Sequence, residues 1–267
     1  MFDISQFEGD AYQDEGSYWR AHDFMVRLGY ESWASFKGVV QKAQASCLQL
    51  GIDIDGVFKN VTLKDGTKSY GLTRFACFLI AMQADTKKPQ VIAAQVALAA
   101  IAEELLKEKI SESDLARIEE RGKLTLAEKH LSGVAKSAGL SQGVEFAVFK
   151  DAGFRGMYDM SLKELRDYKG SPTDKTLYDF MGLTELAANT FRVTQTAERM
   201  KRNNVRGLDG SKKMAHEVGR EVREVMLRSS GVAPEDLKLE GGINSKKKQI
   251  KSANKKMQKL DSGKGKK

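Results

Sequence analysis

Proline is scarce in this chain, and that scarcity constrains the fold more than any other feature of the sequence. Only 3 of the 267 residues are proline, so long stretches run without the residue that most strongly interrupts a helix. Hydrophobic residues make up 41% of the chain, which is enough apolar material for a core and excludes a wholly disordered protein. We therefore expect a mainly helical α+β fold.

The N-terminal part contains the signals for a small helix-turn-helix unit and one β-hairpin. Ser17 is placed to cap a first helix, and Ser32 to cap a second helix over about 33–50. Asp65-Gly66 stands between two β-prone runs, a pattern that predicts a type I′ hairpin. These elements define a predicted N-terminal domain over residues 1–88.

Helical patterns continue through the middle of the chain. Residues 89–140 are predicted to form a long helical connector, within which Thr125–Glu128 has the pattern of a capping box. Residues 141–240 are predicted to form a second helical domain, with one long helix over about 184–203. Apolar residues within 115–138 follow the spacing of a helix that packs on a partner helix, so a homodimer through this segment is an open alternative.

Charge is concentrated at the C-terminal end. Residues 243–267 hold ten Lys and one Asp, whereas residues 1–242 hold 34 basic and 35 acidic residues. The overall net charge of +8 therefore does not by itself indicate that the body of the protein binds nucleic acid. Gly, Ser, Asn, Gln and Lys dominate from 241 onward, so we predict a disordered Lys-rich tail over 241–267 that binds anions without sequence preference.

The sequence contains no motif that predicts catalysis. It has neither the phosphate-binding pattern GxxxxGK(S/T) nor a GxGxxG after a strand. His216-Glu217 begins like a zinc-protease helix, but Arg220 stands where the second His must be. Cys47 and Cys77 are too few for a disulfide framework or a Cys-based zinc site, and are predicted to be buried thiols of a cytoplasmic protein. We expect no enzyme activity, cofactor or metal; a metal-dependent nuclease is the weaker alternative.

Two groups of residues are candidates for contact with nucleic acid or an acidic partner, because cations neutralise phosphates and exposed rings stack on unpaired bases. The first group lies around the helix-turn-helix and consists of Arg20, Arg27, Tyr30, Trp33, Lys37 and Lys42. The alternative for the two aromatic residues of this group is that they pack inside the hairpin. Residues 1–60 also carry nine acidic and only five basic residues, which argues against a strong electrostatic docking face in this part of the chain. The second group lies on and after the helix over 184–203 and consists of Arg192, Gln195, Arg199, Lys201, Arg202 and Arg206. The alternative for this second group is that its side chains form an ordinary solvent-exposed face of the helix.

Several segments, in the same order along the chain, resemble a known family. The densest is MGLTELAANTFRVTQT at 181–196, and two others are LTRFAC at 72–77 and GFRGMY at 153–158. Shorter matches lie at 19–21, 28–30, 89–95 and 145–149. Together they span about 17–225 and resemble the DNA-damage-inducible protein D (DinD) family, whose N-terminal part is similar to the Bro-N-type domains of viral and phage proteins.

The resemblance implies a bacterial, cytoplasmic protein of the SOS response that antagonises RecA filaments on single-stranded DNA without catalysis. Single-stranded DNA, RecA filaments or both are then the expected partners. No membrane partner is expected, because the apolar run at 91–102 is shorter than the roughly 18 residues that a membrane helix needs. The resemblance supplies no established functional residues, so the candidate residues above are chosen by their charge and by the helix face that they occupy. A sequence-specific regulator that reads duplex DNA with the second helix of the hairpin is a further alternative.

Overall fold

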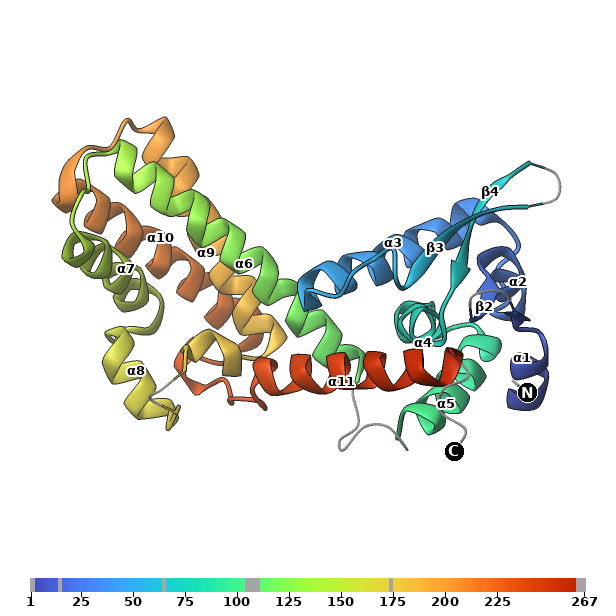
Figure 1. Ribbon diagram of the computed structural model, residues 1–267. Coiled ribbons are helices and arrows are strands. Elements are labelled where there is room, and N and C mark those ends of the chain that lie inside the picture. Colours follow the sequence, from blue (N-terminus) through green and yellow to red (C-terminus); the bar gives the residue numbers. More distant parts are fainter. Residues whose placement is uncertain (1–2, 14–15, 64–65, 104–110, 173–174, 263–267) are drawn as a thin grey trace. The chain divides into compact units, whose positions relative to one another are not determined.

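The chain folds into two compact units in the computed structural model, which describes residues 3–13, 16–63, 66–103, 111–172 and 175–262 (Figure 1). Unit 1 consists of residues 1–118 with 244–267, and unit 2 of residues 119–243. Helices dominate both units and a small antiparallel sheet lies in unit 1, which confirms the predicted fold class. Within the described ranges, no helix is long and apolar enough to cross a membrane.

The described part of unit 1 contains a sheet with strand order β1-β2-β4-β3, in which all neighbours are antiparallel. Its strands are β1 (Tyr12–Gln13), β2 (Ser17–Arg20), β3 (Phe58–Thr62) and β4 (Lys68–Leu72). The pairing of β3 with β4 confirms the predicted hairpin. Asp65 of the predicted type I′ turn lies outside the described residues.

Residues 17–20 form a strand rather than the start of a helix, so the predicted helix cap at Ser17 is wrong. Trp19 pairs with Leu72 across the sheet, and its indole Nε1 donates a hydrogen bond to the carbonyl oxygen of Phe7 at 2.6 Å. The two aromatic rings stack with their centroids 4.3 Å apart. Burial of this aromatic pair stabilises the extended backbone, and the helix begins only at Ala21.

Helices pack against this sheet and against one another. They are α1 (Ile4–Gly9), α2 (Ala21–Arg27), α3 (Trp33–Leu50), α4 (Arg74–Gln83), α5 (Pro89–Glu103), the first turns of α6 (Glu112–Ser137) and α11 (Ile243–Asp261). The Ser32 hydroxyl accepts the N–H of Ser35, which confirms the predicted start of α3. Helix α4 forms the centre of the core, because every residue from Phe75 to Ala81 is at most 2% exposed. Both predicted buried thiols, Cys47 and Cys77, lie in this core.

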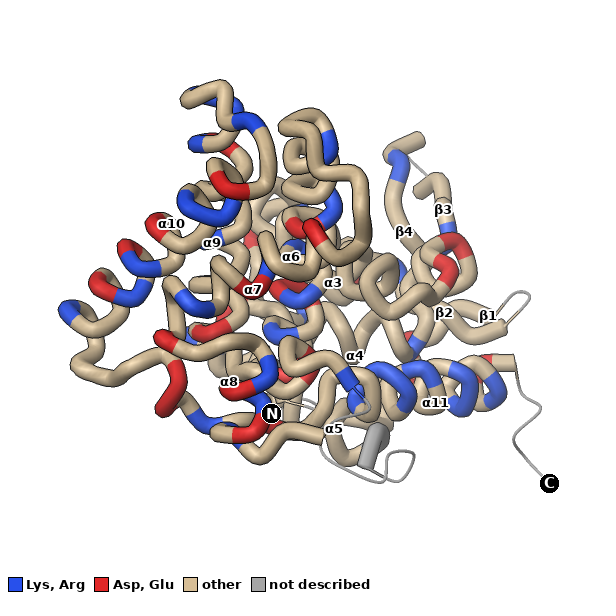
Figure 2. The backbone as a smooth tube through the Cα atoms, turned by 90° about the vertical axis from the view of Figure 1, so that its left-hand side faces the viewer, with Lys and Arg blue, Asp and Glu red and all other residues tan. Residues whose placement is uncertain are grey.

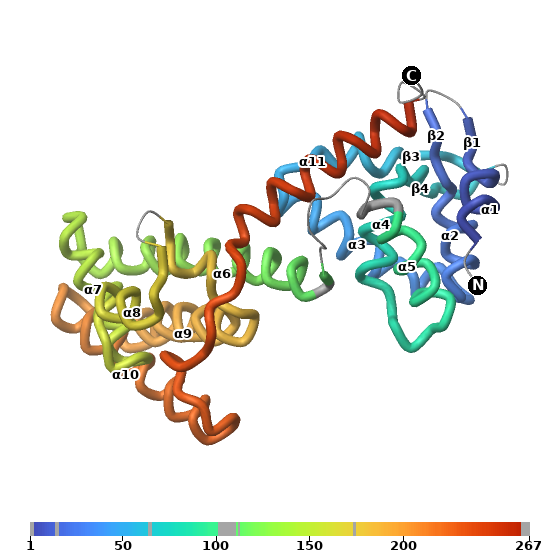
Figure 3. The backbone as a smooth tube through the Cα atoms, turned by 90° about the horizontal axis from the view of Figure 1, so that it is seen from below, coloured from blue at the N-terminus to red at the C-terminus, as the bar shows by residue number. Residues whose placement is uncertain are grey.

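Residues 243–261 form helix α11, so the predicted disorder of the Lys-rich tail is wrong for this segment (Figures 1 and 3). Ile250, Ala253 and Met257 recur on one helical face and are at most 1% exposed. Near its C-terminal end, α11 reaches the β1–β2 connection, where the backbone of Asp261 approaches Gly16. The apolar face explains the helix, because its burial against unit 1 offsets the ordering of a Lys-rich segment.

Unit 2 is helical. Its elements are the remainder of α6, α7 (Gly143–Tyr158), α8 (Leu162–Lys169), the 3-10 helix η1 (Leu177–Phe180), α9 (Leu183–Arg202), α10 (Gly207–Ser230) and the 3-10 helix η2 (Pro234–Asp236). Helices α7 and α10 cross at glycines: a Cβ at Gly219 would lie 2.7 Å from the carbonyl oxygen of Gly153, and one at Gly156 would collide with the backbone of His216. The missing side chains therefore allow the two backbones to touch.

The elements of the middle segment differ from the prediction. Helix α6 is continuous through Thr125, whose hydroxyl donates a hydrogen bond to the carbonyl oxygen of Arg121 at 2.9 Å, so the predicted capping box is wrong. Helix α5 belongs to unit 1, and α6 contributes residues to both units. By these contacts unit 1 extends to residue 118 and unit 2 to residue 243, the latter close to the predicted boundary at 240.

Candidate nucleic-acid interface

Helix α11 presents a row of exposed lysines to solvent. We call it the α11 lysine stripe, and it consists of Lys248, Lys251, Lys255 and Lys259. The spacing i, i+3, i+7, i+11 places all of them on one face of the helix, roughly opposite the buried apolar face. Figure 2 shows how closely the basic residues follow one another along α11.

The stripe has no countercharge among the described residues, because none of its ammonium groups lies within 4.0 Å of a carboxylate oxygen there. Lys246, on a less exposed side of the helix, instead pairs with Asp114 at 3.5 Å. At 1.5 Å per residue the stripe extends about 16 Å. Such a row attracts the phosphates of a nucleic-acid strand and does so without reading the bases.

Asp261 fixes the end of α11 on the core of unit 1. Its carboxylate accepts hydrogen bonds from the backbone N–H and from Nε of Arg74, both at 3.1 Å, at the N-terminus of α4. The same guanidinium donates through Nη2 to Glu8 Oε2 at 2.8 Å. Burial raises the pKa of Asp261, and the nearby charge of Arg74 opposes that rise. Core packing and a buried ion pair therefore hold the lysine stripe in place.

The two aromatic residues predicted for base stacking pack inside unit 1. Tyr30 is 7% exposed, and its hydroxyl accepts the backbone N–H of Asp85 at 2.9 Å. Trp33 is half-buried and stacks on His22 with the ring centroids 4.4 Å apart. For Tyr30 the prediction of a solvent-exposed stacking surface is wrong, because its buried ring packs on that of Phe36, with the centroids 5.2 Å apart.

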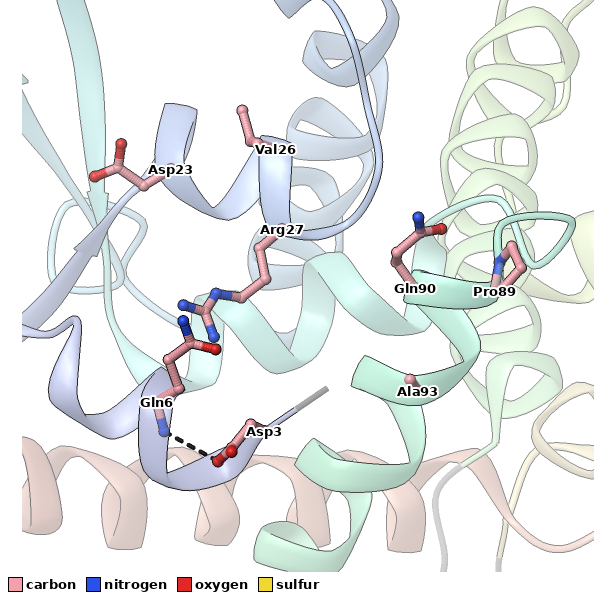
Figure 4. Close-up of a pocket in the computed structure, with 8 residues that line it drawn as sticks. All are labelled: Asp3, Gln6, Asp23, Val26, Arg27, Pro89, Gln90 and Ala93. Atoms are coloured by element: carbon pink, nitrogen blue, oxygen red, sulfur yellow. Dashed lines mark hydrogen bonds between the residues drawn. The ribbon is translucent and has the colours of Figure 1, made fainter. Parts of the chain in front are cut away.

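Arg27 lies beside carboxylates rather than at a basic surface. It pairs with Asp10 and lines an open pocket of about 770 Å³ together with Asp3 and Asp23 (Figure 4). These carboxylates repel a phosphate, so the pocket does not offer an anion site.

The other basic residues of the first group do not form one surface. The Arg20 guanidinium lies over the Tyr12 ring, 4.0 Å from its centroid. Lys37 and Lys42 are exposed on α3, but a separation of five positions directs them to different sides of the helix. Tyr30 and Lys42 line one open pocket, together with the carboxylates of Glu31 and Asp85. The structure does not bring the predicted N-terminal residues together as one group.

Arg192 lies inside unit 2, so its assignment to a solvent-facing surface is wrong. It is 3% exposed, and its Nε and Nη2 donate hydrogen bonds to Asn189 Oδ1 at 3.3 and 2.9 Å. Its Nη2 also donates to the Tyr178 hydroxyl at 3.3 Å. Glu185, on the same face of α9, is buried and pairs with Lys169 at 3.0 Å. Burial raises the pKa of Glu185, and the positive charge of Lys169 opposes the rise.

The remaining residues of the second group lie nearer the end of α9. Arg199 pairs with Glu221, its Nη1 lying 2.6 Å from Oε1. Lys201 contacts Glu198 and His130, and Arg206 donates to the carbonyl oxygen of Ser137. Gln195 is half-buried, whereas Arg202 is exposed and has no ion pair among the described residues. Most of these side chains therefore have structural partners.

The α11 lysine stripe is a candidate surface that the residue-level prediction missed. The signal was present in the sequence, because Ile243, Ile250 and Met257 recur every seven residues while lysines occupy the opposite face. The composition of the segment instead favoured disorder, because a Lys-rich segment with few apolar residues is typical of a disordered chain.

Comparison with known proteins agrees with the resemblance noted in the sequence. Residues 110–257 match the family model described as the DinD C-terminal domain. The chain is also similar to a protein of Escherichia coli (strain K12) named DNA damage-inducible protein D, with 32% identity over 233 residues. That similarity covers 82% of this chain and 85% of the relative. The resemblance of the N-terminal unit to Bro-N domains stays a prediction. The two matches together extend over most of the chain, which therefore belongs to the DNA damage-inducible protein D family.

Proposed function

We propose that this protein is a non-enzymatic, cytoplasmic modulator of DNA repair that binds single-stranded DNA and antagonises recombinase filaments. The α11 lysine stripe carries the proposal, because it is an exposed row of ammonium groups without carboxylate partners among the described residues. The name of the Escherichia coli relative, DNA damage-inducible protein D, supports a role in the response to DNA damage. Strand breaks and stalled replication expose single strands, so this form of DNA is the expected target.

Counterion release determines how much the stripe contributes to the affinity for DNA. Each lysine that neutralises a phosphate releases condensed counterions, about 0.7 per contact on single strands and about 0.9 on duplex DNA. Four contacts at about 0.1 M salt then contribute an affinity factor of the order of 10²-fold or more. The contribution is blind to sequence, which suits a protein that acts wherever single strands appear.

The test compares the full chain with a variant in which all four lysines of the stripe are replaced by Gln. Fluorescence anisotropy with labelled single-stranded and duplex DNA measures both affinities. The matched control replaces four other exposed lysines by Gln, namely Lys68, Lys87, Lys163 and Lys175, which changes the net charge equally. We expect the stripe variant to lose single-strand affinity by about 10²-fold and the control to lose far less. Equal losses in both variants would mean that overall charge, not the stripe, governs binding.

A second arm uses RecA filaments assembled on single-stranded DNA and follows their disassembly. If DNA contact drives the activity, the stripe variant fails to disassemble filaments. If it still disassembles them after losing DNA affinity, the protein recognises the recombinase itself and the role given to the stripe is wrong. A duplex-reading regulator predicts a third pattern, in which Lys37→Gln with Lys42→Gln abolishes duplex binding while the stripe variant retains it.

A further inference from the structure

Unit 2 contains a cavity of about 300 Å³ that the stripe does not involve. Side chains from α6, α7, α9 and α10 line it, and Tyr178 of η1 contributes an aromatic wall. Its volume is at the lower end of small-molecule sites, so it admits one small ligand rather than a run of nucleotides.

A buried cation without a countercharge lines this cavity. Arg192 is 3% exposed, and within the described residues no carboxylate oxygen lies within 4.0 Å of its guanidinium. Its Nε and Nη2 are used by Asn189 and Tyr178, whereas Nη1 has no hydrogen-bond partner among the described residues. Buried charges are normally paired, because an isolated one loses its hydration without compensation. An anion entering the cavity would provide the missing partner.

The backbone leaves room for this guanidinium. A Cβ added at Gly153 of α7 would collide with Arg192 Nη1, so only glycine accommodates the observed side chain. On the other side, the Arg192 guanidinium carbon lies 5.1 Å from the centroid of the Phe154 ring. Glycine and the aromatic ring thus fix the charged group in position.

The lining around Arg192 indicates which anion fits. Lys129 and Lys150 are exposed at the cavity rim, and Glu128 pairs with Lys150 at 2.5 Å. Together with Arg192 these groups carry a formal charge of +2, which matches a phosphomonoester of charge −1.5 to −2 near pH 7. The planar guanidinium suits phosphate oxygens better than a point charge does.

The apolar lining indicates what is attached to the phosphate. Phe146, Phe149 and Tyr178 line the same cavity. Aromatic side chains of this kind stack on nucleobases of any sequence. We propose that this cavity binds one nucleoside monophosphate group, with its phosphate on Arg192 and its base against the aromatic side chains. The group comes from a free nucleotide or from the 5′-phosphorylated end of a DNA strand.

Isothermal titration calorimetry on the full chain tests the site with deoxyadenosine monophosphate. Deoxyadenosine and inorganic phosphate are the partial ligands, and 5′-phosphorylated and 5′-hydroxyl oligonucleotides in high salt distinguish the two sources. We expect one nucleotide per chain, with both partial ligands binding at least tenfold more weakly. Preference for the 5′-phosphorylated strand over the free nucleotide assigns the strand end, and the reverse preference assigns the free nucleotide.

The variant Arg192→Lys keeps the charge but removes the planar fork, and it should weaken nucleotide binding about tenfold or more. If that variant unfolds, Lys129→Gln with Lys150→Gln at the exposed rim still tests the site, and we expect a loss of several-fold. Lys163→Gln with Lys175→Gln is the matched control and should bind normally. Absence of binding, or binding that neither site variant weakens, overturns the proposal. The stripe variant should bind the nucleotide normally, so failure at one site is separable from failure at the other.

Discussion

Replacing Asp261 by Ala should detach the end of helix α11 from unit 1. The carboxylate is 7% exposed and accepts two hydrogen bonds from Arg74, one from the backbone and one from Nε. Loss of this acceptor leaves buried donors unpaired, at about 1–3 kcal/mol for each, and removes an anion from the N-terminus of α4, which adds about 0.3–1 kcal/mol. Because Glu8 still pairs with the guanidinium, we expect a net loss of about 2–4 kcal/mol.

Urea unfolding, monitored by tryptophan fluorescence, measures this loss of unfolding free energy in unit 1. The chain has two tryptophans, Trp19 and Trp33, and both lie in unit 1. The control is Asp209→Ala, since the Asp209 side chain is fully exposed and its removal should leave the tryptophan transition unchanged. Hydrogen exchange should show faster exchange along α11 in the Asp261 variant alone. An unchanged midpoint with unchanged exchange would refute the view that this ion pair anchors α11.

Three further outcomes follow from burial in the two units. Cys47 and Cys77 should not react with a thiol reagent until the protein unfolds, because burial raises the pKa of Cys47 to about 12 and that of Cys77 well above its ordinary value. Gly156→Ala should destabilise unit 2 by about 1–3 kcal/mol through overpacking, because the new Cβ meets the His216 backbone. The thermal midpoint of unit 2, measured by far-UV circular dichroism, should therefore fall by several degrees. Burial raises the pKa of Glu185 above its ordinary 4.5, so the folded state binds more protons than the unfolded state between these two values. Stability of unit 2 should therefore fall as pH rises through that window, and Glu185→Gln should remove this contribution from the pH profile of the unfolding free energy.

Local signals in the sequence predicted the elements whose structure local contacts determine. The hairpin of β3 and β4, the Ser32 cap of α3 and the extent of α9 are of this kind.

Long-range contacts decided the elements that the sequence predicted wrongly. The end of helix α11 is fixed by the contact of Asp261 with Arg74, which is 187 positions away, so no local pattern could reveal this partner. Arg192 faces inward because Gly153 of another helix leaves space for its guanidinium. In both cases residue type alone indicated solvent exposure, whereas tertiary packing placed the segment against a core.

The salt dependence of single-strand binding tests the central claim most directly. The logarithm of the binding constant is plotted against the logarithm of salt concentration for the full chain, for the variant with Gln at all four stripe positions, and for the matched four-lysine control. At about 0.7 counterions per contact, the stripe variant should lose about 2.8 from the magnitude of the slope, and the control should lose much less. A stripe variant with the slope of the full chain would contradict the account, because the lysines of α11 would then not contact the DNA phosphates.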